Sequence, residues 1–101
     1  VATDVPSLAT RDALHLARPN PFNPRTTLAF ELARSARVAL EVFDSRGRRV
    51  VTLVDGTRAA GPHRVVWTGT DASGRSVASG VYFVRLRAGA FEQTRRVALV
   101  R

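Results

Sequence analysis

The side chains best suited to acid–base chemistry are two histidines, His15 and His63, which lie far apart in the sequence. Nucleophilic catalysis needs a serine or cysteine beside a base that a third group orients. Neither histidine has a glycine-elbow motif near it. His63 directly follows Pro62, a position typical of the start of a strand. We therefore expect no nucleophilic catalysis.

Carboxylates and glycines also lack the patterns that enzymes use. Glu31, Glu41 and Glu92 are the only glutamates. The first two fall on the polar sides of alternating segments, where we expect solvated charges rather than an acid–base pair. The glycines are dispersed over separate turns instead of forming a phosphate-binding loop before a helix: Gly56, Gly61, Gly69 and Gly74. The sequence predicts neither an enzyme nor a bound cofactor.

Two Asp-x-x-Gly segments suggest either metal loops or tight turns: Asp44 with Gly47, and Asp71 with Gly74. Aspartate at the first turn position accepts a hydrogen bond from the backbone two residues on, and glycine supplies the positive φ that closes a type I turn with a bulge. Each segment offers one carboxylate, whereas calcium takes about six to eight oxygens. We predict two turns and no metal site.

The composition fits one domain. The chain has 101 residues, of which 45% are apolar, enough to bury one core. All 16 basic residues are arginine against 8 acids, and a net charge of +8 favours anionic partners such as nucleic acid, an acidic surface polysaccharide or lipid headgroups. Because the arginines are spread along the whole chain, a soluble surface covered with arginine is the favoured explanation of this charge. The arginines lack the interleaved aromatic pattern that stacks bases, so nucleic acid is not an expected partner.

Residues 1–13 are expected to be a linker, because polar residues and isolated apolar residues are mixed there and show no sustained period. The chain contains no methionine and begins at Val1, so we expect it to be part of a longer polypeptide with a domain upstream. Cysteine is absent, which excludes disulfides and thiolate chemistry. No apolar run approaches the roughly 20 residues of a membrane helix.

The segment Asn20, Pro21, Phe22, Asn23 and Pro24 precedes the alternating part of the chain. Its prolines fix φ, remove backbone donors and push the preceding residues toward extended conformations, so no helix or central strand passes through it. Phe22 is its only apolar side chain. We expect Phe22 to close the N-terminal end of a core, opposite the C-terminal strands. A buried Phe22 would indicate a structural role, and an exposed one a docking site.

From residue 26 onward, apolar and polar residues alternate with the period of half-buried strands. The expected strands are 26–32, 38–43, 50–54, 63–68, 81–88 and 94–100, with an ambiguous short segment at 14–16. Six or seven strands predict an all-β, antiparallel β-sandwich of the immunoglobulin or fibronectin III type over residues 14–101, without a disulfide. A small barrel is the alternative. Gly61 is expected in a turn, and Trp67 is the expected core anchor because it can bury the largest apolar area.

Four stretches resemble one family when taken in order: LARPNPFNPRTTLAFEL, VALEVFDSRGRRVVTL, AAGPHRVVWTGTDASGRSVASGVYFVRL and RRVALVR. The chain is similar, over about residues 14–101, to the C-terminal sorting domains of cargo exported by the type IX secretion system. That family grades into the immunoglobulin-like domain of the flagellar hook-capping protein. Arginine stands where the family usually has lysine, and Thr68 replaces the aspartate that usually follows the tryptophan. Arginine substitutes for lysine as a charge but not as an amine.

The resemblance implies a non-catalytic module joined covalently to an upstream cargo domain. Such cargo reaches the periplasm by a signal peptide, is recognised by outer-membrane secretion machinery, and is released and attached to the cell surface by a sortase-like enzyme. The implied localisation is therefore secreted or on the bacterial surface, and we expect a monomer. The residues that match the family's recognition motifs are Gly80, Val81, Tyr82, Arg95, Arg96 and the terminal Arg101.

Two other functions stay open from the sequence. A structural or assembly domain would act by rigid packing between neighbours, as in the hook cap. An accessory carbohydrate-binding module would need exposed aromatic side chains, for which Phe43 and Phe83 are the candidates, although packing at a sheet edge is the favoured explanation of both.

Overall fold

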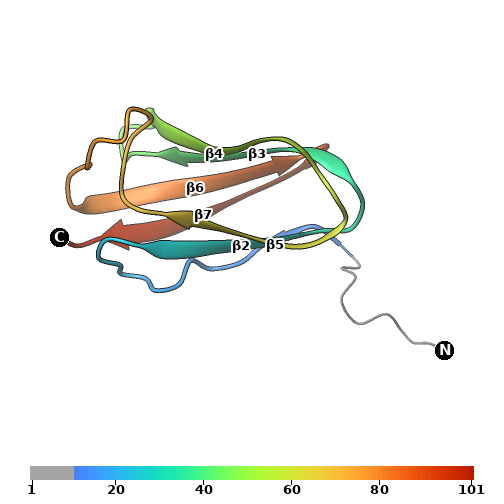
Figure 1. The fold of residues 1–101 in the computed structure, drawn as a ribbon, viewed down its shortest axis with the longest axis horizontal. Coiled ribbons are helices and arrows are strands. Elements are labelled where there is room, and N and C mark those ends of the chain that lie inside the picture. The colour runs from blue at the N-terminus through green and yellow to red at the C-terminus, as the bar shows by residue number, and fades with distance from the viewer. Residues whose placement is uncertain (1–10) are drawn as a thin grey trace.

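The computed structural model of the protein describes residues 11–101, so the predicted linker over residues 1–13 lies for the most part outside them. Two antiparallel sheets pack face to face (Figure 1). The three-stranded sheet has the order β1 (Ala13–Leu14), β2 (Thr26–Leu32) and β5 (Gly61–Trp67). The four-stranded sheet has the order β4 (Arg49–Arg58), β3 (Ala36–Phe43), β6 (Gly80–Ala88) and β7 (Phe91–Leu99). The predicted β-sandwich is confirmed, and the barrel alternative is wrong.

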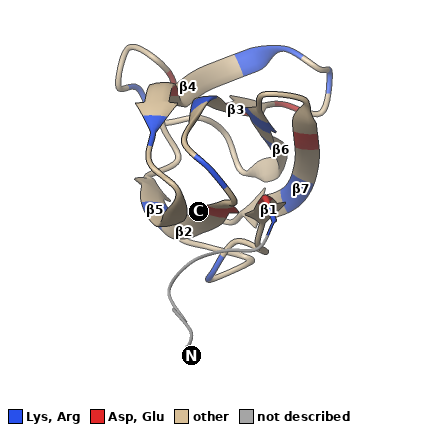
Figure 2. Ribbon diagram, turned by 90° about the vertical axis from the view of Figure 1, so that its right-hand side faces the viewer, with Lys and Arg blue, Asp and Glu red and all other residues tan. Residues whose placement is uncertain are grey.

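The core lies between the sheets and follows the predicted alternation. In β2, Leu28, Phe30 and Leu32 are buried, while Thr27 and Ala29 face outward. The same period buries one side of β3 and of β6, and the two sheets surround a common interior when seen end-on (Figure 2). Side chains of both inner faces interdigitate in such a sandwich, which is why a single core suffices.

Both Asp-x-x-Gly segments are turns, as predicted. The Asp44 carboxylate accepts hydrogen bonds from the backbone N–H of Arg46 at 2.9 Å and of Arg48 at 3.0 Å, and Gly47 has a φ of 84°. The bond from the backbone of Arg48 helps to hold the pKa of Asp44 below its ordinary value.

The second turn repeats this arrangement. Asp71 accepts from the backbone of Ser73 and Arg75, and the φ of Gly74 is 87°. Each carboxylate is thus engaged by its own turn. Within residues 11–101, no group of three or more His, Cys, Asp or Glu side chains could hold a metal ion.

The strand after the first turn is longer than predicted. β4 runs through Asp55 and Gly56 to Arg58, well past the apolar run at 50–54. Gly61 opens β5 with a φ of 112°, and Pro62 lies within that strand. The proline is tolerated because β5 is an edge strand. No helix in the described part of the chain is long and apolar enough to span a membrane.

Glu41 contradicts the prediction of a solvated carboxylate. It lies on the outer side of β3 but is only 5% exposed. Arg49 of β4 and Arg85 of β6 donate to its two oxygens at 3.1 and 2.9 Å, and Arg87 lies 3.6 Å away. Long arginine side chains from the strands on both sides of β3 cover the shorter glutamate, which the sequence of β3 alone does not reveal. Glu31 is also paired, with His15.

Replacing Glu41 with glutamine is expected to lower the free energy of unfolding by about 1–3 kcal/mol at neutral pH, the range for hydrogen bonds to charged groups. The hydrogen bonds from the arginines, led by Arg85, hold the pKa of Glu41 below its ordinary value in spite of burial. A carboxyl with a lowered folded pKa stabilises above its unfolded pKa, and this contribution is lost as the pH falls through the folded pKa. Urea unfolding at stepwise lower pH should therefore show the wild type converging on the variant.

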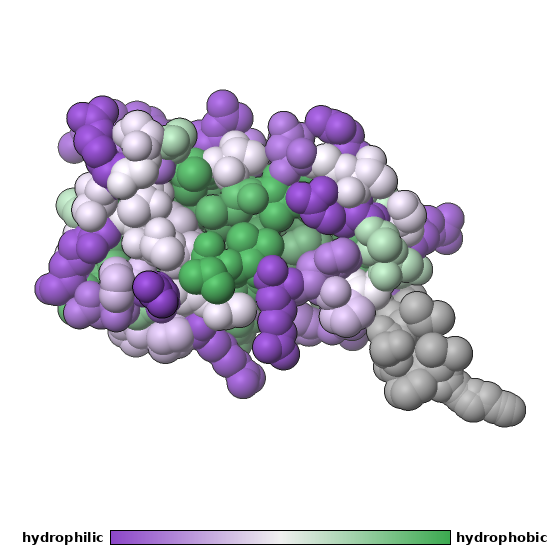
Figure 3. All heavy atoms as spheres, in the orientation of Figure 1, coloured by the Kyte–Doolittle hydropathy of each residue, from purple (hydrophilic) through white to green (hydrophobic). Residues whose placement is uncertain are grey.

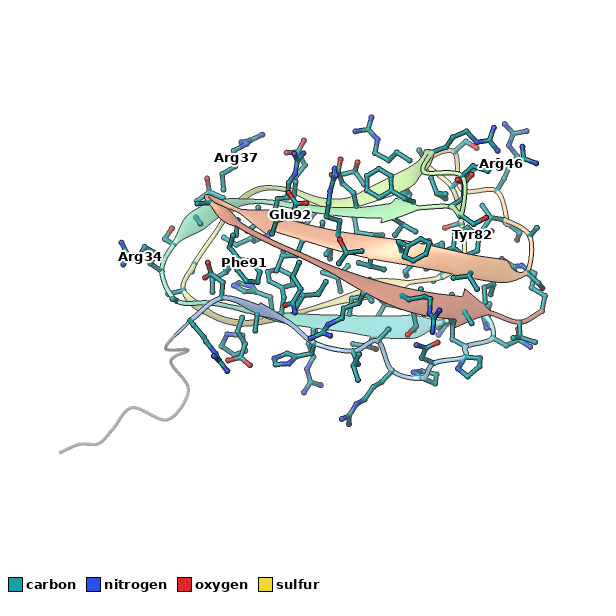
Figure 4. All side chains as sticks on the ribbon, turned by 180° about the vertical axis from the view of Figure 1, so that it is seen from behind. Arg34, Arg37, Arg46, Tyr82, Phe91 and Glu92 are labelled. Carbon is teal, nitrogen blue, oxygen red and sulfur yellow. The ribbon has the colours of Figure 1, made fainter. Side chains whose placement is uncertain are left out.

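The matched control is Glu92→Gln on β7, because Glu92 is exposed and no hydrogen bond or ion pair is found for its side chain among the described residues (Figure 4). It should change stability by less than about 0.5 kcal/mol. A gap between wild type and Glu41→Gln that stays constant down to acid pH would contradict the proposed role of the charge.

Candidate functional site on the C-terminal hairpin

The segment at residues 20–24 packs along β7, so the expectation that it lies opposite the C-terminal strands is wrong. The N–H of Phe22 donates to the carbonyl of Ala98 at 2.9 Å, and the N–H of Val100 donates to the carbonyl of Phe22 at 3.0 Å. The Asn20 side chain accepts from the N–H of Ala98 and donates to the carbonyl of Arg96. The prolines exclude a regular strand, yet these bonds extend the edge of β7.

Phe22 is 2% exposed, so the structural interpretation of this segment is supported over the docking one. Its ring lies 5.4 Å from that of Trp67, which in turn lies 5.2 Å from Tyr82. Trp67 is buried as predicted, and its indole N–H donates to the carbonyl of Thr70 at 2.9 Å. These three aromatic rings join the segment, β5 and β6 at one end of the core.

Most of the Gly80–Val81–Tyr82 segment, which matches the family's recognition motif, contributes to packing and strand pairing. The Tyr82 ring is buried, and its hydroxyl donates to the carbonyl of Ala78 at 2.6 Å. Burial raises the pKa of Tyr82, which keeps the hydroxyl protonated. The backbone of Gly80 pairs with Leu99. Only Val81 presents a side chain to solvent, at 41% exposure.

The three arginines of the predicted recognition set are placed in three different ways. Arg95 lies on the inward side of β7 and donates from Nε to the carbonyl of Leu14 at 2.8 Å. Arg96 faces outward, and no hydrogen bond or ion pair is found for its guanidinium within residues 11–101. Adjacent positions of a strand point to opposite faces, so the Arg95–Arg96 pair cannot act as one basic patch.

Arg101 is anchored instead of free. Its Nε donates to the carbonyl of Val77 at 2.8 Å, its Nη2 to the carbonyl of Gly69 at 2.6 Å, and its backbone N–H to Ser79. Gly69 permits this approach, because a Cβ there would lie 2.8 Å from Nη2 and its φ is 70°. The last residue thus fastens the loop between β5 and β6.

Among the matched residues, Val81 and Arg96 remain accessible. With Ala98 and Val100 they form a small surface on the outer side of β6 and the end of β7, which we call the hairpin surface. Val81 and Ala98 are direct cross-strand partners. Val81 and Val100 are 41% and 53% exposed. The hairpin surface combines apolar area with one positive charge, a composition suited to binding a protein partner.

Phe43 and Phe83, the candidates for a carbohydrate platform, are cross-strand partners and half-buried. The guanidinium of Arg85 lies 4.6 Å from the centre of the Phe43 ring and covers part of it. Figure 3 shows a second apolar area, on the side of the sandwich bounded by the edge strands β4 and β5. Leu53 of β4 and Val65 of β5 are partly buried against the core.

Two antiparallel sheets packed face to face form the architecture of an immunoglobulin-like domain. The hydrogen bond from the Tyr82 hydroxyl to the carbonyl of Ala78, in the loop before β6, is a second feature of such domains. Residues 20–90 match the FlgD Ig-like domain, and the chain belongs to that family. No curated protein sequence matches the chain.

Among the solved structures that are similar over most of the chain, three bear on its fold. Dimeric latent PorU from Porphyromonas gingivalis has a TM-score of 0.71 at 19% identity, covering 88% of this chain and 9% of PorU. PorZ, described as an essential bacterial surface component of the type IX secretion system of P. gingivalis, has a TM-score of 0.61 at 26% identity, covering 87% and 11%. FlgD from P. aeruginosa has a TM-score of 0.58 at 22% identity, covering 91% and 74%. The chain therefore spans about a tenth of the two Porphyromonas proteins.

Proposed function

We propose that this domain is a non-catalytic module that directs a covalently joined upstream protein across the outer membrane to the cell surface. The observation that carries the proposal is the hairpin surface, which stays accessible on a sandwich whose other matched motif residues are used for folding. The similarity to part of PorZ, a surface component of the type IX secretion system, also supports a role in export to the cell surface. The proposed location is the bacterial surface or the exterior, reached through the periplasm.

The hairpin surface offers the export machinery a rigid, preformed binding element. Val81 and Val100 supply apolar area, and Arg96 supplies a charge that selects an acidic contact. Because β6 and β7 are fully paired and the segment at 20–24 is bonded to β7, little ordering is required on binding. The proposed partners are the outer-membrane machinery and a sortase-like enzyme that acts after docking.

Substituting Val81→Ser together with Arg96→Glu is expected to reduce surface display of a reporter by about tenfold, which corresponds to a loss of about 1.4 kcal/mol in docking. The reporter is fused to the whole chain, residues 1–101, in a host with a type IX secretion system. Display is measured by whole-cell labelling against total reporter. Deleting residues 94–101 is a poorer test, because it removes the fully buried Val97 and Leu99 and so destroys the core.

Arg34→Glu provides the matched control, because it makes the same charge change at the opposite end of the sandwich from Tyr82 (Figure 4). It should leave display unchanged, and both proteins should keep the wild-type melting temperature. Normal display of the double variant, or an equal loss with Arg34→Glu, would reject the hairpin surface as the docking element.

A second candidate function is a structural or assembly domain, and membership of the FlgD Ig-like family is the observation that favours it. Such a domain acts by packing between neighbours, and the apolar area between β4 and β5 could serve for this (Figure 3). The two candidates differ in two measurements. An assembly domain gives no display of the wild-type fusion and shows self-association in analytical ultracentrifugation.

A further inference from the structure

A concave surface lies on the outer side of the three-stranded sheet, where Arg95 of the neighbouring strand β7 borders it. It has a volume of about 590 Å³, which lies within the usual range of small-molecule sites. We call it the basic concavity, and its lining residues are His15, Leu16, Arg18, Thr27, Ala29, Arg64 and Arg95.

The sequence forms the hollow by placing small residues between flanking walls. Leu28 and Phe30 point into the core, so Thr27 and Ala29 form the outward floor. The wall is the segment after β1, which the backbone fixes to β2. The N–H of His15 donates to the carbonyl of Ala29 at 2.9 Å, and Arg18 and Thr27 exchange backbone hydrogen bonds at 3.1 and 2.7 Å. The concavity therefore belongs to the rigid part of the fold.

Three arginines from three different elements line the basic concavity. Arg18 comes from the wall, Arg64 from β5 and Arg95 from β7. The bond from Arg95 Nε to the carbonyl of Leu14 holds that side chain in place at the edge of the hollow and leaves its two terminal nitrogens without a hydrogen bond to residues 11–101. Within residues 11–101 none of the three forms an ion pair, and the nearby Glu31 is bonded to His15.

This arrangement differs from the arginine cluster on the other sheet. There, three guanidiniums share the buried carboxylate of Glu41 and are neutralised in part by it. In the basic concavity no carboxylate is among the lining residues. Its positive charge is therefore available to a ligand.

We propose that the basic concavity binds a phosphate monoester. A guanidinium is a planar donor pair that matches two oxygens at a time, and a terminal phosphate presents three oxygens and close to two negative charges. Three guanidiniums around one hollow match that group better than a carboxylate, which has two oxygens and one charge. The volume leaves room for a sugar ring or a headgroup beside the phosphate, against the exposed side chain of Leu16.

The test is a titration of the full chain with glucose 1-phosphate, inorganic phosphate and acetate, followed by amide and arginine Nε–H resonances in NMR. We expect saturable shifts at Ala29, Arg64 and the Nε–H of Arg95, with acetate at least about tenfold weaker than either phosphate. Arg64→Ala should raise the Kd for glucose 1-phosphate about tenfold, and Arg64→Lys by less, since lysine keeps the charge but loses the paired donors.

Arg46→Ala is the matched control, because Arg46 is an exposed arginine of the 44–47 turn whose backbone alone is hydrogen-bonded. It should leave the Kd unchanged within about twofold. Arg18→Ala gives a second variant if Arg64→Ala alters the fold, which circular dichroism shows. Equal weakening by Arg46→Ala, unsaturable shifts at all arginines, or acetate binding as tightly as phosphate would each overturn the proposal.

Two further measurements separate the possible sources of the phosphate and distinguish the phosphate site from the docking surface. Vesicles containing phosphatidic acid that bind more tightly than glucose 1-phosphate identify a lipid headgroup, and the reverse identifies a phosphorylated sugar; either outcome supports the site. The phosphate site is independent of the export function, so Arg64→Ala should leave reporter display unchanged if docking occurs at the hairpin surface. Failure of one proposal therefore does not imply failure of the other.

Discussion

Replacing Trp67 with alanine is expected to lower the free energy of unfolding by about 3–5 kcal/mol, the usual cost of truncating a buried aromatic side chain. Trp67 is 1% exposed and contacts both Phe22 and Tyr82, so its removal opens a cavity between two other rings. The variant also leaves the carbonyl of Thr70 without its indole donor. Urea unfolding followed by circular dichroism measures the loss.

The neighbouring Val66 supplies the control for this experiment. It lies on the opposite side of β5 and is 52% exposed, so Val66→Ala should cost less than about 0.5 kcal/mol. Trp67→Phe should fall between the two, because it keeps a ring but loses the indole N–H. A loss of under about 1 kcal/mol for Trp67→Ala would mean that the site collapses around the cavity and that Trp67 is not the anchor of the core.

Phe22→Ala is expected to have the second largest effect, lowering the free energy of unfolding by about 3–5 kcal/mol as well. Unlike most core substitutions, it should also loosen one particular contact, between the segment at 20–24 and β7. Phe22 joins the aromatic cluster and exchanges backbone hydrogen bonds with the end of β7. Without the ring, the segment at 20–24 should separate from β7 more often. Hydrogen exchange at the amides of Ala98 and Val100 should then become faster than exchange in β3.

Asn23→Ala tests whether the ring itself is responsible, because Asn23 is an exposed member of the same segment. It should leave both the stability and the exchange at Val100 unchanged. If Phe22→Ala lowers stability but leaves the relative protection of Val100 as in the wild type, then the backbone bonds alone hold the segment to β7. That result would leave Phe22 with a packing role only.

These two results bear on the proposed export function. The hairpin surface is built on β7, and β7 is held on its outer edge by the segment at 20–24. A variant that loosens this segment would alter docking indirectly. The display assay therefore compares only variants whose stability and exchange at Val100 match the wild type.

The strands could be predicted from the sequence because their signal is local. A period of two in the apolar residues identified which side of β2, β3 and β6 is buried, and it placed Trp67 in the core. The turns at Asp44 and Asp71 followed from side chains that bond to backbone two and four residues away. Each of these inferences needed only residues that are near one another in the chain.

The tertiary structure alone decided which distant residues meet. A strand period says that Glu41 faces outward, but the arginines that bury it come from β4 and β6. The sequence matched Tyr82 and Arg101 to a recognition motif, but it could not show that Tyr82 packs against Trp67 or that Arg101 bonds to the carbonyl of Gly69. In the same way Arg18, Arg64 and Arg95, far apart in sequence, share one concavity.

For the segment at Asn20 to Pro24, the sequence determined the local conformation and the tertiary structure determined the partner. Its prolines determined locally that no helix or regular strand could form there, and its single apolar residue predicted that Phe22 would enter the core. Its partner could not be predicted, because β7 is the last strand of the chain and the bonds between them depend on how the two sheets pack. Local chemistry determined the conformation of the segment, and the packing of the sheets decided that it would support the C-terminal strand.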